Sequence, residues 1–141
     1  MSIYADTSFL VSVYVPDQHS SATNPRLASR PGIWLTPLHS AEWIHAVERQ
    51  VFQKKLSRQE AQRIYREFDT DRDSEVWIEV ALPDSVFVVC DDLSRRYTAR
   101  LGNRTLDTLH VASALELEAS SFWTFDERQS RLARAVGLKT D

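Results

Sequence analysis

Short β-prone runs alternate with helical segments along most of this chain, and this alternation limits the possible folds more than any other feature. Strands separated by helices indicate an α/β domain with a mostly parallel sheet. Ligands of such sheets bind beyond the carboxyl ends of the strands. The runs that we expect to form strands are Ser2–Ala5, Gly32–Pro37, Val76–Leu82 and Phe122–Phe125, and Leu138–Thr140 is a candidate for a last short strand.

Helical periodicity and capping signals place helices between these runs. Ser8–Val15 is compatible with strand or helix, and we favour a turn followed by a helix. Asn24 and Pro25 are expected to break any helix in the polar segment Asp17–Ser29. The later helices are expected over His39–Gln53, over Ser57–Phe68 with a capping box of Ser57 and Glu60, from Pro83 to Gly102, over Thr105–Ala119 and over Asp126–Val136.

Size and composition fit a single domain that spans residues 1–141. A chain of 141 residues needs no disulfide or metal to form a core. Cys90 is the single cysteine, which excludes an intrachain disulfide and a cysteine zinc site. No apolar run reaches about 18 residues, and Asp6 interrupts an apolar start that no Lys or Arg precedes. We therefore expect no transmembrane helix, no signal peptide and a cytoplasmic location.

Arginine is the main basic residue, and its distribution is uneven. The formal net charge is −3, so bulk charge gives no support to nucleic-acid binding. Of the 17 basic residues, 14 are arginine, whose guanidinium suits bidentate phosphate contacts. The segment 95–104 contains no acid and carries Arg95, Arg96, Arg100 and Arg104. These four residues are candidates for substrate binding, and a solvated helix face is the alternative.

Four acidic residues stand where the chain leaves a strand or enters a helix. Asp6 and Asp126 directly follow the first and fourth expected strands, whereas Glu42 and Asp107 lie in the first turns of helices. Each has a structural explanation as a helix cap or as a partner of the helix dipole. Together, however, they fall on one edge of a parallel sheet. An all-oxygen acidic pocket there favours Mg²⁺ or Mn²⁺, which can support phosphodiester hydrolysis.

Four motifs carry a resemblance that covers nearly the whole chain. They are ADTSFL at 5–10, LHSAEW at 38–43, RTLDTLHVASAL at 104–115 and TFDERQ at 124–129. In this order and spacing they resemble the motifs of the PIN-domain nucleases, in particular the VapC-type toxins of bacterial toxin–antitoxin pairs. The resemblance implies a three-layer α/β/α domain with a central, mostly parallel sheet of five strands.

The same resemblance implies an activity, a cofactor, a partner and a set of site residues. It implies an endoribonuclease that depends on Mg²⁺ or Mn²⁺ and is inhibited by a cognate VapB-type antitoxin, and we also expect a homodimer. The catalytic and metal-binding quartet carried over by position is Asp6, Glu42, Asp107 and Asp126. Ser8 and Thr124 fall where the family often places a small hydroxyl beside the metal. The region of Pro25 departs from many relatives, which have an unbroken helix there.

An apolar stripe on the helix that carries Glu42 has two interpretations. Trp43, Val47 and Val51 recur at a spacing of four residues, so they form either plain core or one wall of a groove for the antitoxin tail. The acidic pocket beside such a groove would attract an antitoxin Arg or Lys, which would replace the charge of the metal.

Other constellations of polar residues are less consistent with a site. His39 and His45 are six residues apart, about 240° around a helix, so they diverge and do not form a zinc site with Glu42. His110 lies between apolar neighbours and is interpreted as a core or surface histidine. The rival function is a module that grips RNA or a protein without cutting, and the complete acidic quartet disfavours it.

Overall fold

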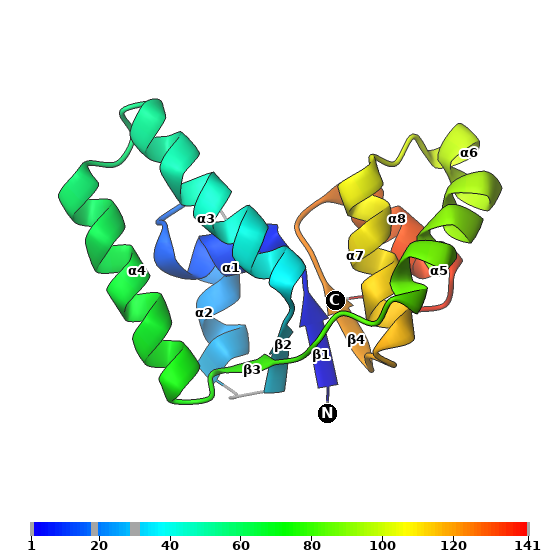
Figure 1. Ribbon diagram of the computed structural model, residues 1–141, viewed down its shortest axis with the longest axis horizontal. Helices are drawn as coiled ribbons and strands as arrows, with labels where there is room; N and C mark the ends of the chain where they lie inside the picture. The colour runs from blue at the N-terminus through cyan, green and yellow to red at the C-terminus, as the bar shows by residue number, and fades with distance from the viewer. Residues whose placement is uncertain (1, 18–19, 29–31, 141) are drawn as a thin grey trace.

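The computed structural model describes residues 2–17, 20–28 and 32–140, and a parallel sheet lies at its centre. In this part of the chain the sheet has four strands in the order β3-β2-β1-β4 (Figure 1). The strands are β1 (Ser2–Ala5), β2 (Gly32–Leu35), β3 (Trp77–Glu79) and β4 (Ser121–Trp123). Ile3 aligns with Ile33 on one side and with Ser121 on the other. The order of strands therefore reverses at β1, and such a reversal is where open α/β sheets bind ligands.

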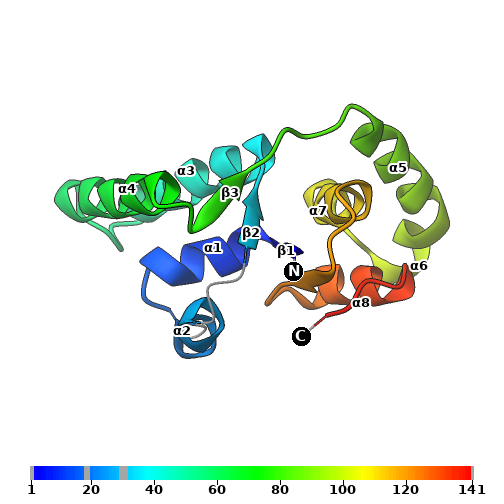
Figure 2. The same ribbon diagram turned by 90° about the horizontal axis from the view of Figure 1, so that it is seen from below.

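The helices divide into two groups, one on each face of the sheet (Figures 1 and 2). The first group is α1 (Thr7–Tyr14), α2 (Ser20–Ala28), α3 (Pro37–Phe52) and α4 (Arg58–Asp73). The second group is α5 (Ser85–Leu93), a π-helical turn η1 (Ser94–Thr98), α6 (Ala99–Leu101), α7 (Thr105–Glu116) and α8 (Glu127–Ala135). This arrangement confirms the expected three-layer α/β/α domain.

Alternating side chains of the strands build two separate cores. Successive residues of a strand point to opposite faces of a sheet. Ile3 and Ala5 of β1 accordingly pack with α1, α3 and α4, whereas Tyr4 packs with α5, α7 and α8. The same alternation separates Trp123 from Phe122 in β4. Both faces are thus buried, as is usual for parallel sheets.

The fifth strand that the resemblance implied is not formed within the described residues. The candidate segment Leu138–Thr140 makes an isolated parallel bridge between Thr140 and Phe122. It lies beside β4 at the sheet edge, in the position of a further strand, but it is too short to continue the ladder.

Pro25 lies inside helix α2, so the prediction that it breaks any helix in this segment is wrong. A proline in a helix interior removes one hydrogen bond and crowds the preceding turn. Pro25 is exposed, which leaves this defect on the solvent side of a short helix. Thr23 faces inward, with its Oγ1 2.6 Å from the Ser12 Oγ of α1. Packing against α1 therefore outweighs the local propensity.

The predicted helix ends agree with the structure where capping signals are strong. Ser57 caps α4 and exchanges two hydrogen bonds with Glu60, as the capping box predicts. Gly102 ends α6 with a left-handed φ of 68°, a conformation that favours glycine. The helix expected from Pro83 begins at Ser85 and contains the π-helical turn, which the regular apolar spacing did not reveal.

The apolar stripe of α3 is core, so the groove-wall interpretation of Trp43 and Val47 is wrong. Both side chains are fully buried, and Val51 packs against the same core. The ring of Trp43 lies 5.2 Å from that of Tyr14 and 5.4 Å from that of Phe68. Among the described residues, no helix is long and apolar enough to cross a membrane.

Two isoleucines on adjacent helices allow a matched test of this core. Ile64 of α4 is 2% exposed, whereas Ile44 of α3 is 52% exposed. We expect Ile64→Ala to lower the free energy of unfolding by about 2–5 kcal/mol, because it removes buried methyl groups and leaves a cavity. Ile44→Ala should stay within about 0.5 kcal/mol of the unmodified protein. Urea denaturation followed by circular dichroism measures both, and equal losses would contradict the described packing.

Candidate active site

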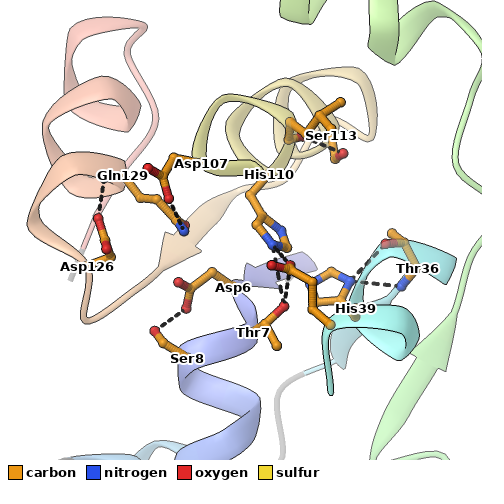
Figure 3. Close-up of polar contacts among 12 residues, drawn as sticks. Asp6, Thr7, Ser8, Thr36, His39, Asp107, His110, Ser113, Asp126 and Gln129 are labelled. Carbon is orange, nitrogen blue, oxygen red and sulfur yellow. Dashed lines mark hydrogen bonds and ion pairs between the residues drawn. The ribbon is translucent and has the colours of Figure 1, made fainter. Parts of the chain in front are cut away.

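The four carboxylates of the acidic quartet line one cavity at the carboxyl edge of the sheet. The cavity has a volume of about 360 Å³. Asp6 follows β1, Glu42 lies on α3, Asp107 on α7 and Asp126 at the start of α8. Figure 3 shows Asp6 at the centre, between Asp107 and Asp126 on one side and His110 on the other. Four elements that are distant in sequence therefore supply acidic groups to one place.

Asp6 is 1% exposed and is held by small polar groups. Its Oδ1 accepts hydrogen bonds from the Ser8 hydroxyl at 2.7 Å and from the Phe9 N–H at 3.1 Å. Its Oδ2 accepts from the Thr124 hydroxyl at 3.0 Å. Asp6 is thus the cap of α1 and a cavity residue at once. Burial raises the pKa of its carboxyl, and these hydrogen bonds only partly oppose that rise.

Backbone contacts on both sides fix the position of Asp6. The Asp6 N–H donates to the Trp123 carbonyl at 2.9 Å, which joins the ends of β1 and β4. The preceding carbonyl, that of Ala5, accepts from Nε2 of His39 at 2.7 Å. Nδ1 of His39 accepts from the Thr36 N–H at 3.0 Å, so His39 takes the place of Glu or Gln in a capping box. These two partners define a neutral His39 that carries its proton on Nε2.

Glu42 is connected to a buried polar network. Its Oε1 accepts a hydrogen bond from the Thr7 hydroxyl at 2.8 Å and contacts Nε2 of His110. Nδ1 of His110 lies 2.8 Å from the Tyr4 hydroxyl, which comes from β1. Burial opposes ionisation of Glu42, but the contacts with His110 and Thr7 outweigh it, and the pKa of Glu42 lies below its ordinary value.

Asp107 is buried, and donors of this chain surround its carboxylate. Oδ2 accepts from the Arg104 N–H at 3.0 Å and from Arg104 Nε at 3.2 Å. Oδ1 accepts from Gln129 Nε2 at 3.2 Å and lies 3.4 Å from Arg104 Nη2. Burial would raise the pKa of Asp107, but these hydrogen bonds outweigh it and lower the pKa.

Asp126 combines a capping role with a second contact to Arg104. Its Oδ1 accepts from the Gln129 N–H at 3.0 Å and so caps α8, as the sequence predicts. Its Oδ2 lies 3.6 Å from Arg104 Nη2. The Asp126 N–H donates to the Thr124 hydroxyl at 2.9 Å, which links this residue to the contacts of Asp6.

The four candidate arginines do not lie together. Of the four, Arg104 is the one that lines the described cavity. Arg96 forms an ion pair with Asp92 at 3.1 Å, and both Arg96 and Arg100 lie over the ring of Tyr97. Arg95 is exposed in η1. Arg95, Arg96 and Arg100 therefore belong to the outer α5–α6 arm, and Arg104 belongs to the acidic pocket.

Sequence reasoning missed several polar residues in or beside the site, among them Thr7, His39, His110 and Gln129. Both histidines are fully buried, in agreement with the core interpretation of His110. His110 also contacts Glu42, and His39 donates to the Ala5 carbonyl that precedes Asp6. Helical spacing could have revealed the two histidines. His39 precedes Glu42 by three residues and His110 follows Asp107 by three, so each shares a helix face with an acid of the quartet.

The donor chemistry of the cavity fits a hard divalent cation. Carboxylate and hydroxyl oxygens are the ligands that Mg²⁺ and Mn²⁺ prefer. Within residues 2–17, 20–28 and 32–140, however, no three His, Cys, Asp or Glu side chains lie close enough together to hold one ion. Arg104 contacts Asp107 and Asp126, and His110 contacts Glu42. The residues present fit such an ion in kind, and in the described arrangement Arg104 occupies the oxygens of Asp107.

A wider groove opens beside the acidic cavity. It has a volume of about 860 Å³ and shares Glu42, Arg104 and the start of α1 with the cavity. Arg49 and His45 of α3 line it together with apolar residues such as Leu38 and Val11. The groove thus combines basic, polar and apolar side chains next to the cavity of the four acids.

Fold and sequence together define the class of this protein. Residues 3–135 match the model of the PIN domain family, so the chain belongs to that family. A search of curated proteins finds no match.

Solved structures show the same fold at low sequence identity. FitAcB from Neisseria gonorrhoeae aligns with a TM-score of 0.73 at 14% identity, over 98% of this chain and 95% of that one. VapC20 from Mycobacterium tuberculosis, a toxin that cleaves the sarcin–ricin loop, aligns with a TM-score of 0.71 at 17% identity, over 96% and 95%. VapBC2 from Rickettsia felis, bound to a DNA fragment from its promoter, aligns with a TM-score of 0.69 at 15% identity, over 100% and 98%.

The buried His39 predicts a pH dependence of stability. Burial, with a smaller contribution from His110, lowers the pKa of His39 from 6.5 to about 3. Between these values the unfolded chain binds a proton that the folded protein excludes. The contribution of His39 to stability is therefore complete above about pH 6.5 and is lost as the pH falls toward 3, with a slope of at most about 1.4 kcal/mol per pH unit.

His39→Gln provides the control for this effect, because glutamine keeps the cap of α3 and does not titrate. We expect the free energy of unfolding of the unmodified protein to fall more steeply between pH 6.5 and pH 4.5 than that of His39→Gln. At pH 7 the variant should be less stable by about 1–3 kcal/mol, since the Ala5 carbonyl loses its donor. Parallel slopes in urea denaturation would show that His39 is not held neutral.

Proposed function

We propose that this protein is an endoribonuclease that depends on Mg²⁺ or Mn²⁺ and acts as the toxin of a toxin–antitoxin pair. One observation carries the proposal. Four carboxylates from four separate elements converge on one cavity at the carboxyl edge of the sheet, and a divalent cation would offset the part of their charge that Arg104 leaves uncompensated. Membership in the PIN domain family supports a hydrolytic nuclease. The similarity of fold to VapC20 and VapBC2 supports a toxin of the VapC type.

The residues of the quartet have distinct proposed roles. Asp6, Asp107 and Asp126 would hold the ion, which when bound would polarise a phosphodiester and activate water. Glu42 would bind the ion or orient the attacking water and accept its proton. Thr7 and His110 hold the Glu42 carboxylate in place. Ser8 and Thr124 direct the two oxygens of Asp6.

RNA is the proposed substrate, and the groove beside the cavity is its proposed path. Arg49 and Arg104 line this groove and could contact phosphates on the way to the acids. Arg95, Arg96 and Arg100 on the α5–α6 arm would add more distant backbone contacts. We further propose a VapB-type antitoxin that covers the site and a homodimeric assembly.

Replacement of Asp6 tests the catalytic proposal. Asp6→Asn keeps the size of the side chain and removes one charge from the cavity. We expect RNA cleavage in Mg²⁺ or Mn²⁺ to fall by about 100-fold or more, as for the loss of metal-site partners. Folding should be unchanged or slightly more stable, because a buried carboxylate is costly to ionise.

The control for this experiment is Asp91→Asn, which changes an exposed aspartate of α5. Its cleavage rate should equal that of the unmodified protein. Full cleavage by a folded Asp6→Asn variant would refute the metal-site proposal. RNA binding without cleavage by the unmodified protein, in either metal, would favour the rival module that grips RNA without cutting it.

The arginines of the α5–α6 arm are proposed to contact the RNA backbone, so their contribution to RNA binding should not depend on the RNA sequence. We expect Arg95→Ala combined with Arg100→Ala to weaken binding of several unrelated RNAs to a similar extent. The slope of log K against log salt should fall by about 0.7 for each lost contact to a single strand. Fluorescence anisotropy over a range of salt concentrations measures both effects.

A matched control changes two exposed arginines of α4, with Arg63→Ala and Arg66→Ala. This variant should keep its affinity and salt slope, because α4 lies on the other face of the sheet. If both double variants behave alike, the α5–α6 arm has no special role and is a solvated surface.

A further inference from the structure

Arg104 occupies the acidic pocket as an internal cation. Its guanidinium lies 3.2 Å from Asp107 through Nε and 3.6 Å from Asp126 through Nη2. Two of the four carboxylates therefore share one positive charge that the chain itself provides. The sequence patch that contains Arg104 predicted a substrate contact and gave no indication of this pairing.

The contacts of Arg104 use the same oxygens that a metal ion would need. Both oxygens of Asp107 accept hydrogen bonds from Arg104, and Gln129 occupies a further position on Oδ1. A carboxylate oxygen has about two lone-pair sites. A cation that binds Asp107 from the cavity must therefore displace the guanidinium. Arg104 and a divalent ion are both positively charged and are attracted to the same carboxylates. The two cations therefore compete for one position.

The side chain of Arg104 is able to leave this position. It is 65% exposed, although the Asp107 side chain that it contacts is 3% exposed. Arg104 precedes α7 as its N-cap residue, and its backbone N–H can keep the bond to Asp107 when the side chain moves. The residue also lines the wider groove beside the cavity. A released guanidinium would thus face the space where we place the phosphates of the substrate.

We propose that Arg104 and the divalent ion exchange at Asp107 and Asp126, so that metal binding releases Arg104 to contact a phosphate of the substrate. This inference rests on the proposed function of the site. In the absence of metal, Arg104 offsets the repulsion between the two aspartates. When the ion takes over this role, Arg104 becomes a substrate-binding residue, and metal and substrate bind cooperatively.

The affinity for metal provides the first test. Isothermal titration with Mn²⁺ in the absence of nucleic acid compares the unmodified protein with Arg104→Gln and Arg104→Ala. We expect both variants to bind Mn²⁺ about fivefold more tightly, because an ion pair made by a largely exposed guanidinium contributes up to about 1 kcal/mol. Arg131→Ala is the matched control, since Arg131 forms an exposed ion pair with Glu127 at 3.2 Å. Its affinity for Mn²⁺ should be unchanged.

Nuclear magnetic resonance of ¹⁵N-labelled arginine side chains provides a direct readout of the exchange. The Arg104 Nε–H should be protected from solvent in the metal-free protein, because it donates to Asp107. Addition of Mg²⁺ should shift this signal and accelerate its exchange with water. The Nε–H of Arg131 should not respond.

Binding of a short single-stranded DNA, used as a source of phosphates, tests the destination of Arg104. Mg²⁺ should increase the affinity of the unmodified protein for this strand by a larger factor than it does for Arg104→Gln. The ratio of the two factors measures the coupling between metal and phosphate that passes through Arg104.

Several results would overturn the inference. Equal or weaker Mn²⁺ binding by the Arg104 variants would show that Arg104 does not compete with metal, and it would leave the nuclease proposal standing. An Arg104 signal that ignores Mg²⁺, or equal enhancement of DNA binding in both proteins, would also refute the exchange. If neither the unmodified protein nor any variant binds Mn²⁺, the proposed metal-dependent function fails, and the exchange fails with it.

Discussion

The hydrogen bond between the Asp6 N–H and the Trp123 carbonyl is the contact on which the site depends. It extends the pairing of β1 and β4 by one residue beyond the end of β1. Because both strands run in the same direction, the acids that follow them, Asp6 and Asp126, emerge at the same edge. Helices α3 and α7, which lie on opposite faces of the sheet (Figure 2), then bring Glu42 and Asp107 to that edge.

The four carboxylates at this edge have different partners. Arg104 lies beside Asp107 and Asp126 on one side, and His110 contacts Glu42 on the other. The hydrogen bonds to Asp6 at the centre come from two hydroxyls and one backbone N–H. Burial accordingly raises the pKa of Asp6, whereas the pKa values of Asp107 and Glu42 are lowered.

Local signals in the sequence predicted much of the fold and of the acidic quartet. The capping box of Ser57 and the glycine at 102 act within one helical turn, so their effects do not depend on the rest of the chain. Acids that follow strands converge through topology alone, which is why the positions of Asp6 and Asp126 could be inferred.

Long-range packing decided the features that the sequence left ambiguous or predicted wrongly. An apolar helix face is the same pattern whether it meets a core or a partner, so Trp43 could not be assigned from spacing. Pro25 is tolerated in α2 because of contacts with α1 that no local rule describes. Likewise, a run of arginines does not reveal that Arg104 turns toward the acids and the others do not.

The pairing of the first strand with the last has a consequence for biosynthesis. Ile3 pairs with Ser121, which is made only after β2, β3 and helices α1 to α7. A nascent chain that lacks β4 has neither the carbonyl that holds Asp6 nor the acid at 126. Pairing of such distant segments is also slow. The acidic cavity can therefore form only after β4 and the start of α8 have been made.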